Sequence, residues 1–339
     1  VLINLIKSTF HNEAETKKLL SEFILNSSIL SMNKQCADFE VNFAKKQNRK
    51  FGVMVNSGSS ANLVLIQSLL NTSNLKVGDL VAVSALTWST NIMPLIQLGL
   101  KVVLVDCELD TLNVSLNQFK KTYDKHPNIS MFFITNTLGH ADNIDEISLF
   151  CLKKNILFIE DNCEALGSKV NGNLLGNFGL ASTFSFFVGH HLSTIEGGMI
   201  CTDNEEIYNS LIMTRAHGWD RNLKKNTSLK LRKKYKVDDF YNKYTFYDLA
   251  FNVRPTEISG FLGNVQIQYL EEIISKREQN FLRVNEYIKR NNEFYHLKFD
   301  HMNVLSSFAI PLITKSKEIQ LKYRKKFTDA RIEIRPMIA

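Results

Sequence analysis

The sequence predicts an α/β protein with a mostly parallel sheet that is covered by helices on both faces. From residue 51 onward, short apolar runs rich in Val, Ile and Phe alternate with amphipathic stretches of helix length. Uninterrupted apolar strands between helices are typical of a sheet that is buried on both faces. The 339 residues are 44% hydrophobic and 22% charged. They supply material for one large α/β domain with an appendage, or for roughly two domains.

The N-terminal part and the sheet are predicted first. Residues 1–50 form an N-terminal segment with a helix, because Asn12 followed by Glu15 is a capping pattern and the helical pattern continues to about Leu25. Residues 51–255 form the large α/β domain, with its sheet over roughly 50–215. The predicted strands cover residues 51–56, 80–84, 101–106, 131–135, 156–161, 183–187 and 198–202.

The rest of the chain predicts a linking helix and a second domain. Pro255 stands where the first turn of a helix can use it, and residues 256–290 have the apolar spacing of one long helix between domains. Residues 291–339 are expected to form a smaller α+β C-terminal domain, with strands at 308–313 and 332–334 around a basic helix at 319–327. The chain starts at Val1 and stops at Ala339 without a closing helix, so we expect both ends to be truncated.

Composition excludes several classes of protein. The five cysteines are an odd number, are widely spaced and include no C-x-x-C pair, which argues against a disulfide framework and a zinc finger. We therefore expect a reducing compartment, a cytoplasmic location and no metal. No apolar run reaches 18 residues, so no membrane partner is expected.

A local basic segment carries most of the net charge of +7. Between Arg221 and Lys243 there are nine Lys or Arg against two acidic residues. Such a segment can meet nucleic acid, an anionic lipid surface or a nucleotide diphosphate, and a solvated loop is an equally good interpretation. No nucleic-acid-binding signature accompanies it, so no nucleic-acid partner is expected.

Two segments of the sheet domain carry candidate chemistry. Asn56-Ser-Gly-Ser-Ser-Ala-Asn62 lies between a strand and a helix, where backbone N–H groups, hydroxyls and the helix dipole bind a phosphate. Ile159-Glu-Asp-Asn-Cys-Glu-Ala165 ends a strand at the edge where open α/β sheets bind ligands. Its Asp161 can accept a hydrogen bond from a protonated pyridine nitrogen and so keep a pyridoxal ring acting as an electron sink. For the first segment, the alternative is that its small polar residues serve turn geometry only. For the second, the alternative is that Asp161 caps the segment that follows.

A third segment, Ser185-Phe-Phe-Val-Gly-His-His-Leu-Ser-Thr-Ile-Glu-Gly-Gly198, completes a pattern. In this order and separation, the three segments resemble the sugar-nucleotide aminotransferases (DegT/StrS-like), which are fold-type-I pyridoxal phosphate (PLP) enzymes. The resemblance extends to Phe251-Asn-Val-Arg-Pro-Thr-Glu-Ile-Ser-Gly260 and covers nearly the whole chain. It implies the three-layer, aspartate-aminotransferase-like fold and a homodimer with shared active sites.

The sequence departs from the family pattern at the Schiff-base lysine. Counting on from Ser185 places His190 there, and no lysine occurs between Lys169 and Lys224. A histidine can move a proton near neutral pH but cannot hold the cofactor covalently. Pyridoxamine phosphate (PMP) is then the expected resting form. His191 is the alternative reacting histidine, and the spacing from Ser185 favours His190.

Within the family, a histidine at this position is typical of the sugar 3-dehydratases. The segment around His190 looks most like the branch that acts on GDP-4-keto-6-deoxy-D-mannose in colitose, O-antigen and lipopolysaccharide biosynthesis. The implied reaction removes the C3 hydroxyl of a nucleotide-linked 4-keto-6-deoxyhexose and releases ammonia, with His190 as base and then acid. L-glutamate regenerates PMP from PLP.

The resemblance also implies the roles of the other site residues. The cofactor would be held by Gly58, Ser59 and Ser185 at its phosphate and by Trp88, Asp161 and Glu164 at its ring. Asn252 would enter the site from the partner subunit. Weaker candidates for substrate contact are His217, Arg221 and Arg254, the last because a guanidinium suits a diphosphate. For Trp88, a place in the core is the alternative.

Three other functions stay open on the sequence alone. A CDP-sugar dehydratase would carry a 2Fe–2S cluster held by cysteines, for which the close cysteine pair is missing. A sugar aminotransferase would need the absent lysine. A non-catalytic sensor that binds PLP or a sugar nucleotide would retain Asp161 and Ser185 as an enzyme does.

Overall fold

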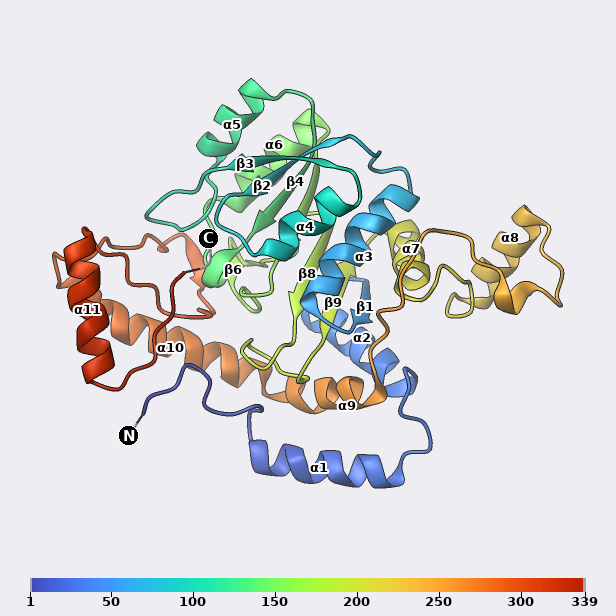
Figure 1. The fold of residues 1–339 in the computed structure, drawn as a ribbon, viewed down its shortest axis with the longest axis horizontal. Coiled ribbons are helices and arrows are strands. Elements are labelled where there is room, and N and C mark those ends of the chain that lie inside the picture. Colours follow the sequence, from blue (N-terminus) through green and yellow to red (C-terminus); the bar gives the residue numbers. More distant parts are fainter. Residues whose placement is uncertain (1, 338–339) are drawn as a thin grey trace.

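The computed structural model describes residues 2–337 and contains the predicted α/β sheet (Figure 1). Seven strands lie in the order β1-β9-β8-β5-β4-β2-β3. Only the two pairs that involve β9 are antiparallel, which confirms a mostly parallel sheet. Each strand starts and ends within two residues of its predicted range. The strands are β1 (Phe51–Val55), β2 (Leu80–Ser84), β3 (Lys101–Val105), β4 (Ile129–Thr135), β5 (Leu157–Asp161), β8 (Ala181–Ser185) and β9 (Gly198–Thr202).

Both faces of the sheet are buried. In β4, Met131 and Phe133 belong to one apolar cluster and Phe132 to another, so successive side chains enter opposite layers. The first cluster is covered by α3 (Gly58–Asn71), α4 (Ser89–Gln97) and α7 (Glu205–Arg215). The second is covered by α5 (Leu116–Lys125) and α6 (Ile144–Lys154). Because each face packs on helices, the strands need no alternating polar residues.

The N-terminal segment holds two helices, α1 (Glu13–Asn26) and α2 (Lys34–Lys46), of which the sequence predicts only α1. The expected capping by Asn12 is wrong, because this residue is left-handed (φ 51°) and its side chain makes no cap bond. α2 is capped from a distant part of the chain. The Glu257 carboxylate accepts the backbone N–H groups of Asn33, Gln35 and Cys36 at 2.6, 2.8 and 3.1 Å.

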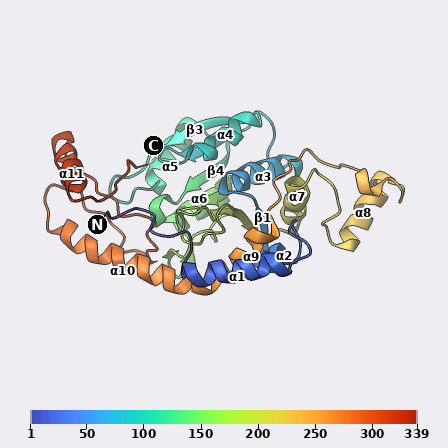
Figure 2. The ribbon, with the colours of Figure 1, turned by 60° about the horizontal axis from the view of Figure 1, so that its bottom comes forward.

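The linking helix is interrupted. It consists of α9 (Glu257–Gln266), a 3-10 turn η3 (Ile267–Tyr269) and α10 (Leu270–Lys289). Thr256 is the N-cap and forms a capping box with Ser259, so Pro255 precedes the cap and does not lie in the first turn. α9 packs closely on α2, because a Cβ on Gly263 would lie 2.6 Å from the Phe39 ring. In both views, α1, α9 and α10 lie along the same side of the molecule (Figure 1, Figure 2).

The C-terminal part contains a helix, α11 (Lys317–Asp329), and one strand, β10 (Met302–Val304). β10 pairs with β6 (Lys169–Val170), which pairs with β7 (Asn173–Leu174). The strands predicted at 308–313 and 332–334 are wrong. The backbone N–H of Phe308 donates to the Leu138 carbonyl at 3.0 Å, so this segment is tied to the sheet domain. Ile332 makes only an isolated bridge with Ile3.

The basic segment forms a helix, α8 (Lys225–Tyr235), that projects from the body of the molecule (Figure 1). The interpretation as a simple loop is therefore wrong. Arg232 anchors α8 through an ion pair of 2.6 Å with buried Asp220. Two further 3-10 turns are η1 (Thr137–Gly139) and η2 (Asn242–Tyr244). Every helix within residues 2–337 is too short or too polar to cross a membrane.

Candidate active site

The three predicted segments meet at the carboxyl edge of the parallel strands. A Cβ on Gly58 would lie 2.6 Å from Ser185 Cβ. A Cβ on Gly198 would lie 2.2 Å from the carbonyl oxygen of Ser57. The turn before α3, the end of β8 and the start of β9 are therefore in backbone contact. Gly198 reaches this edge because β9 runs antiparallel to its neighbours.

One end of the site has the features of a phosphate cradle. Ser57 caps α3, because its hydroxyl accepts the Ser60 N–H at 3.0 Å. The first turn of α3 contains no acidic residue, so its positive dipole end is not neutralised there. Gly58 lies in this turn against Ser185, and Ser59 beside it is exposed. This arrangement suits an anion, as predicted for this segment.

Asp161 forms the other end of the site. Its carboxylate accepts hydrogen bonds from Asn91 Nδ2 at 2.8 Å, from Asn62 Nδ2 at 3.1 Å and from the Cys163 N–H at 2.9 Å. Thr183 Oγ1 donates to Asn62 Oδ1 at 2.7 Å, which turns the Asn62 amide N–H toward Asp161. The carboxylate is thus fixed in orientation, and it can accept a further bond from a pyridine N–H.

Asn62 and Asn91 are site residues that the sequence analysis missed. Asn62 belongs to the first segment, but only the fold shows that its amide meets Asp161. Asn91 lies one helical turn beyond Trp88, whose carbonyl accepts the Asn91 N–H at 3.0 Å. The Trp88 indole is 54% exposed, so the core interpretation of this residue is wrong. An exposed aromatic face at the start of α4 can stack on a planar ring.

Glu164 follows Asp161 on the same turn. Its Oε2 accepts the backbone N–H of Leu138 at 2.8 Å. Burial raises the pKa of Glu164 to about 7, although the Leu138 N–H and the positive charge of Arg335 act in the opposite direction. Glu164 is therefore a half-buried carboxyl group whose charge changes near neutral pH.

The two adjacent histidines have different environments. His191 is buried, and its Nε2 lies 2.9 Å from the Ser306 carbonyl, which gives it a structural partner. The His190 ring lies 5.1 Å from the Phe308 ring. Among the described residues, Nδ1 of His190 has no hydrogen-bond partner. Nδ1 of His191 has none among these residues either, so the two rings differ in burial and in the Ser306 contact. The deeper burial of His191 and its bond to Ser306 support His190 as the reacting histidine.

The pKa of His190 is lowered to about 4. Burial is the largest cause, the charges of Arg277 and Arg335 add to it, and the Cys163 carbonyl opposes it. The imidazole is therefore neutral at pH 7 and can accept a proton.

The remaining predicted residues gather around Trp219. The Trp219 ring lies 4.6 Å from the His217 ring and 3.9 Å from the Arg221 guanidinium. Arg254 lies 5.6 Å from the same ring and donates to Asn252 Oδ1 at 2.9 Å. Within one chain, the structure thus brings Asn252, His217, Arg221 and Arg254 together around Trp219.

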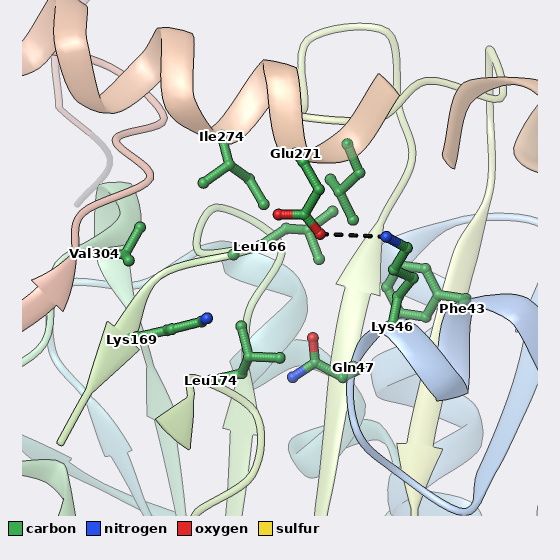
Figure 3. A pocket seen from close by; sticks show the side chains of 11 residues that line it. Phe43, Lys46, Gln47, Leu166, Lys169, Leu174, Glu271, Ile274 and Val304 are labelled. Carbon is green, nitrogen blue, oxygen red and sulfur yellow. Dashed lines mark hydrogen bonds and ion pairs between the residues drawn. The ribbon is translucent and has the colours of Figure 1, made fainter. Parts of the chain in front are cut away.

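A separate pocket of about 130 Å³ lies beneath α10 (Figure 3). Apolar side chains from α2, α10 and the β6–β7 hairpin line it, and an ion pair of 3.3 Å between Lys46 and Glu271 stands at its edge. None of the predicted site residues lines this pocket. Within residues 2–337, no group of three His, Cys, Asp or Glu side chains is placed to hold a metal ion.

Comparison with known proteins agrees with this geometry. The model of the DegT/DnrJ/EryC1/StrS aminotransferase family matches residues 11–337. The GDP-4-keto-6-deoxy-D-mannose 3-dehydratase of Escherichia coli O55:H7 is 36% identical over 338 residues, covering 98% of this chain and 85% of that protein.

Two solved structures of GDP-4-keto-6-deoxymannose-3-dehydratase are also similar. One contains a trapped PLP–glutamate geminal diamine; its TM-score is 0.89 at 34% identity, covering 99% of this chain and 86% of that one. The other is a variant with bound GDP-perosamine; its TM-score is 0.87 at 33% identity, with coverage of 99% and 86%.

The family match covers nearly all described residues, and the fold and the site agree with it. The glycine-lined phosphate cradle, the oriented carboxylate and the exposed indole fit PLP. One of the similar solved structures contains PLP as a glutamate adduct. The chain therefore belongs to the DegT/DnrJ/EryC1/StrS aminotransferase family and has the fold of its PLP-dependent members.

Proposed function

We propose that this chain is a PLP/PMP-dependent 3-dehydratase that removes the C3 hydroxyl of GDP-4-keto-6-deoxy-D-mannose. The observation that carries the proposal is His190, a histidine at the lysine position in a site that otherwise suits PLP. The similarity to enzymes named for this reaction supports the choice of substrate.

The proposed cofactor contacts follow from the site. Gly58, Ser59 and Ser185 hold the phosphate, Trp88 covers the ring, and Asp161 accepts a hydrogen bond from the ring nitrogen. When bound, the cofactor supplies a ring that takes up electrons from the reacting carbon. Glu164, half-protonated near neutral pH, lies beside the ring and can hold a proton there.

His190 supplies the proton transfers in this proposal. Its neutral imidazole accepts a proton at the reacting centre, and once charged it can donate this proton to the departing C3 hydroxyl. The half-buried imidazole lies beside the Phe308 ring, which shields the base on that side from bulk water. L-glutamate is proposed as the amino donor, because a similar enzyme holds a PLP–glutamate adduct.

The decisive experiment supplies purified protein with PMP and GDP-4-keto-6-deoxy-D-mannose. We expect one ammonia and one 4-keto-3,6-dideoxy sugar for each sugar consumed, and no covalent attachment of the cofactor after borohydride. A stable 4-amino sugar would instead identify an aminotransferase. Cofactor or sugar binding without any product would identify a sensor.

We further propose that the protein acts as a homodimer with shared active sites. The resemblance of the segment around Asn252 to the family segment that enters the neighbouring subunit's site supports this. The projecting arm, residues 221–249, also exposes apolar side chains that a partner could cover, namely Leu229, Tyr235, Phe240, Tyr241, Tyr244, Phe246 and Leu249.

Mixed subunits test the shared site. His190→Asn and Asn252→Ala each inactivate the homodimer in this proposal. A heterodimer of the two variants has one site with both defects and one with neither, so mixing should restore activity. If each chain formed its own site, every site would keep a defect and no activity would return.

A further inference from the structure

The segment from Leu305 to Phe308 lies between α10 and the two adjacent histidines. The Ser306 carbonyl meets His191 Nε2 at 2.9 Å, and the Ser306 N–H donates to Ser168 Oγ at 3.0 Å. The Leu305 N–H donates to Glu278 Oε1 of α10 at 3.1 Å. The C-terminal part of the chain is thus fastened to the loop that carries His190.

Arg277 of α10 is central to this junction. Its guanidinium donates to the carbonyls of Phe308 at 2.9 Å, Ser307 at 3.3 Å and His190 at 3.5 Å. The Arg277 side chain also lies 6.0 Å from the centre of the Phe308 ring. Within residues 2–337, no carboxylate lies within ion-pair distance of this guanidinium. A half-buried cation that bonds only to carbonyl oxygens costs free energy to desolvate. What it contributes in return is the position of those carbonyls.

A histidine at the lysine position must be aimed by the protein alone. A lysine there is tethered through its covalent link to the cofactor, whereas an imidazole has no such link. The contacts around His190 supply the missing constraint, because Arg277 fixes its carbonyl and also fixes Phe308, whose ring lies against the imidazole at 5.1 Å.

We propose that Arg277 is the positioning residue that aims His190, by joining the His190 and Phe308 carbonyls through one guanidinium. This inference rests on the proposed function of His190 as the reacting base. It adds a group on α10, outside the three sequence segments, to the machinery of the site.

The charge of Arg277 also bears on the protonation of His190. The titratable and charged groups near the imidazole are Arg277 of α10, Arg335 of the C-terminal segment, Cys163 after β5 and the adjacent His191. Burial keeps the Cys163 thiol and the His191 ring neutral by raising and lowering their respective pKa values. Burial is the largest cause of the low pKa of His190, and Arg277 and Arg335 are the cations that lower it further.

Two substitutions separate the geometry from the charge. Arg277→Lys keeps the cation but loses the planar fork that spans two carbonyls. Arg277→Gln loses both. Arg283→Gln is the matched control, because Arg283 is exposed on the same helix.

The first readout is the pKa of His190 in the cofactor-free protein, from hydrogen exchange at each histidine Cε1 followed by mass spectrometry. We expect a rise of about one unit or more in Arg277→Gln, and little change in Arg277→Lys and Arg283→Gln. This measurement does not depend on activity, so it remains decisive if the dehydratase assay itself fails. A wild-type protein without product would count against the proposed function, whereas an unmoved pKa in Arg277→Gln would count against this inference.

The second readout is the steady-state rate of ammonia release at increasing sugar-nucleotide concentration, with L-glutamate present to regenerate PMP. Misplacing the base should lower kcat about 100-fold in Arg277→Lys while KM for the sugar nucleotide changes less than about threefold. Phe308→Leu, which removes the facing ring from a half-buried site, should lower kcat in the same way. If Arg277→Gln fails to fold, the Lys and Leu variants decide. A kcat within twofold of wild type in Arg277→Lys would overturn the proposal.

Discussion

The contact between Gly58 and Ser185 makes Gly58→Ala a sharp test of the phosphate cradle. The new Cβ would lie 2.6 Å from Ser185 Cβ and 3.1 Å from the sulfur of Cys163. Carbon atoms in ordinary contact are about 3.5–4.0 Å apart, so the start of α3 and the end of β8 would have to separate by about 1 Å. Ser185 cannot rotate its Cβ away, because β8 is held to β9 at the Ser185–Gly198 pair.

Overpacking of this kind costs about 1–3 kcal/mol. If the cost falls on the cofactor complex, PLP binds about 5- to 150-fold more weakly, since 1.4 kcal/mol corresponds to tenfold in affinity. The assay is a PLP titration followed by absorbance, with thermal unfolding of the cofactor-free protein alongside.

Gly172→Ala is the control for this substitution. Gly172 has a left-handed φ of 78° and nothing within 4 Å of a new Cβ, so its replacement strains only the backbone. It should lower stability and leave PLP affinity unchanged. A Gly58→Ala protein that binds PLP within twofold of wild type and unfolds at the same temperature would refute the close approach of α3 to β8.

Three further outcomes follow from the structure. His190→Asn should lower the single-turnover rate of ammonia release at least about 100-fold, whereas His191→Asn should mainly lower the unfolding temperature; comparable rate losses would contradict the assignment of the base. Glu257→Gln should destabilise the protein by about 1–2 kcal/mol, because the carboxylate caps three N–H groups at the start of α2, while the exposed Glu271→Gln should change little in the same urea titration. The pKa of buried His140 is lowered to about 4, so the unfolded chain binds an extra proton at that residue between about pH 6.5 and 4. Urea titrations should therefore show the free energy of unfolding decreasing as the pH is lowered from about 6.5 to 4, and His140→Leu should remove about 2 kcal/mol of the loss at pH 5. An identical pH slope in that variant would exclude His140 as a cause.

The parts of the fold that the sequence predicts are those with a local signal. The strands appear as apolar runs because both faces of the sheet are buried, and β2 and β9 have the predicted bounds. Long-range causes leave no such signal. α2 depends on Glu257 for its cap, and the segment at 308–313 bonds to Leu138 of the sheet domain instead of forming a strand.

The candidate site shows the same division. Asp161, Ser185 and His190 can be found from motif spacing, because each stands at or just after the end of a strand and in the order that the family shows. Asn91 has no motif and becomes visible only when α4 and β5 are placed side by side. Arg277 lies far along the chain from His190, and its role depends on hydrogen bonds to carbonyls, which no side-chain pattern encodes.

The position of β1 has a consequence for the order in which the protein can be built. β1 is the first strand of the sheet to leave the ribosome, yet its neighbour is β9, since Phe51 pairs with Thr202. About 150 residues must be synthesised before β1 can find its place, and pairings this distant are slow to form. The phosphate cradle, which needs both Gly58 and Gly198, is completed only at that late stage. Cofactor binding by a newly made chain therefore indicates that β1 has paired with β9.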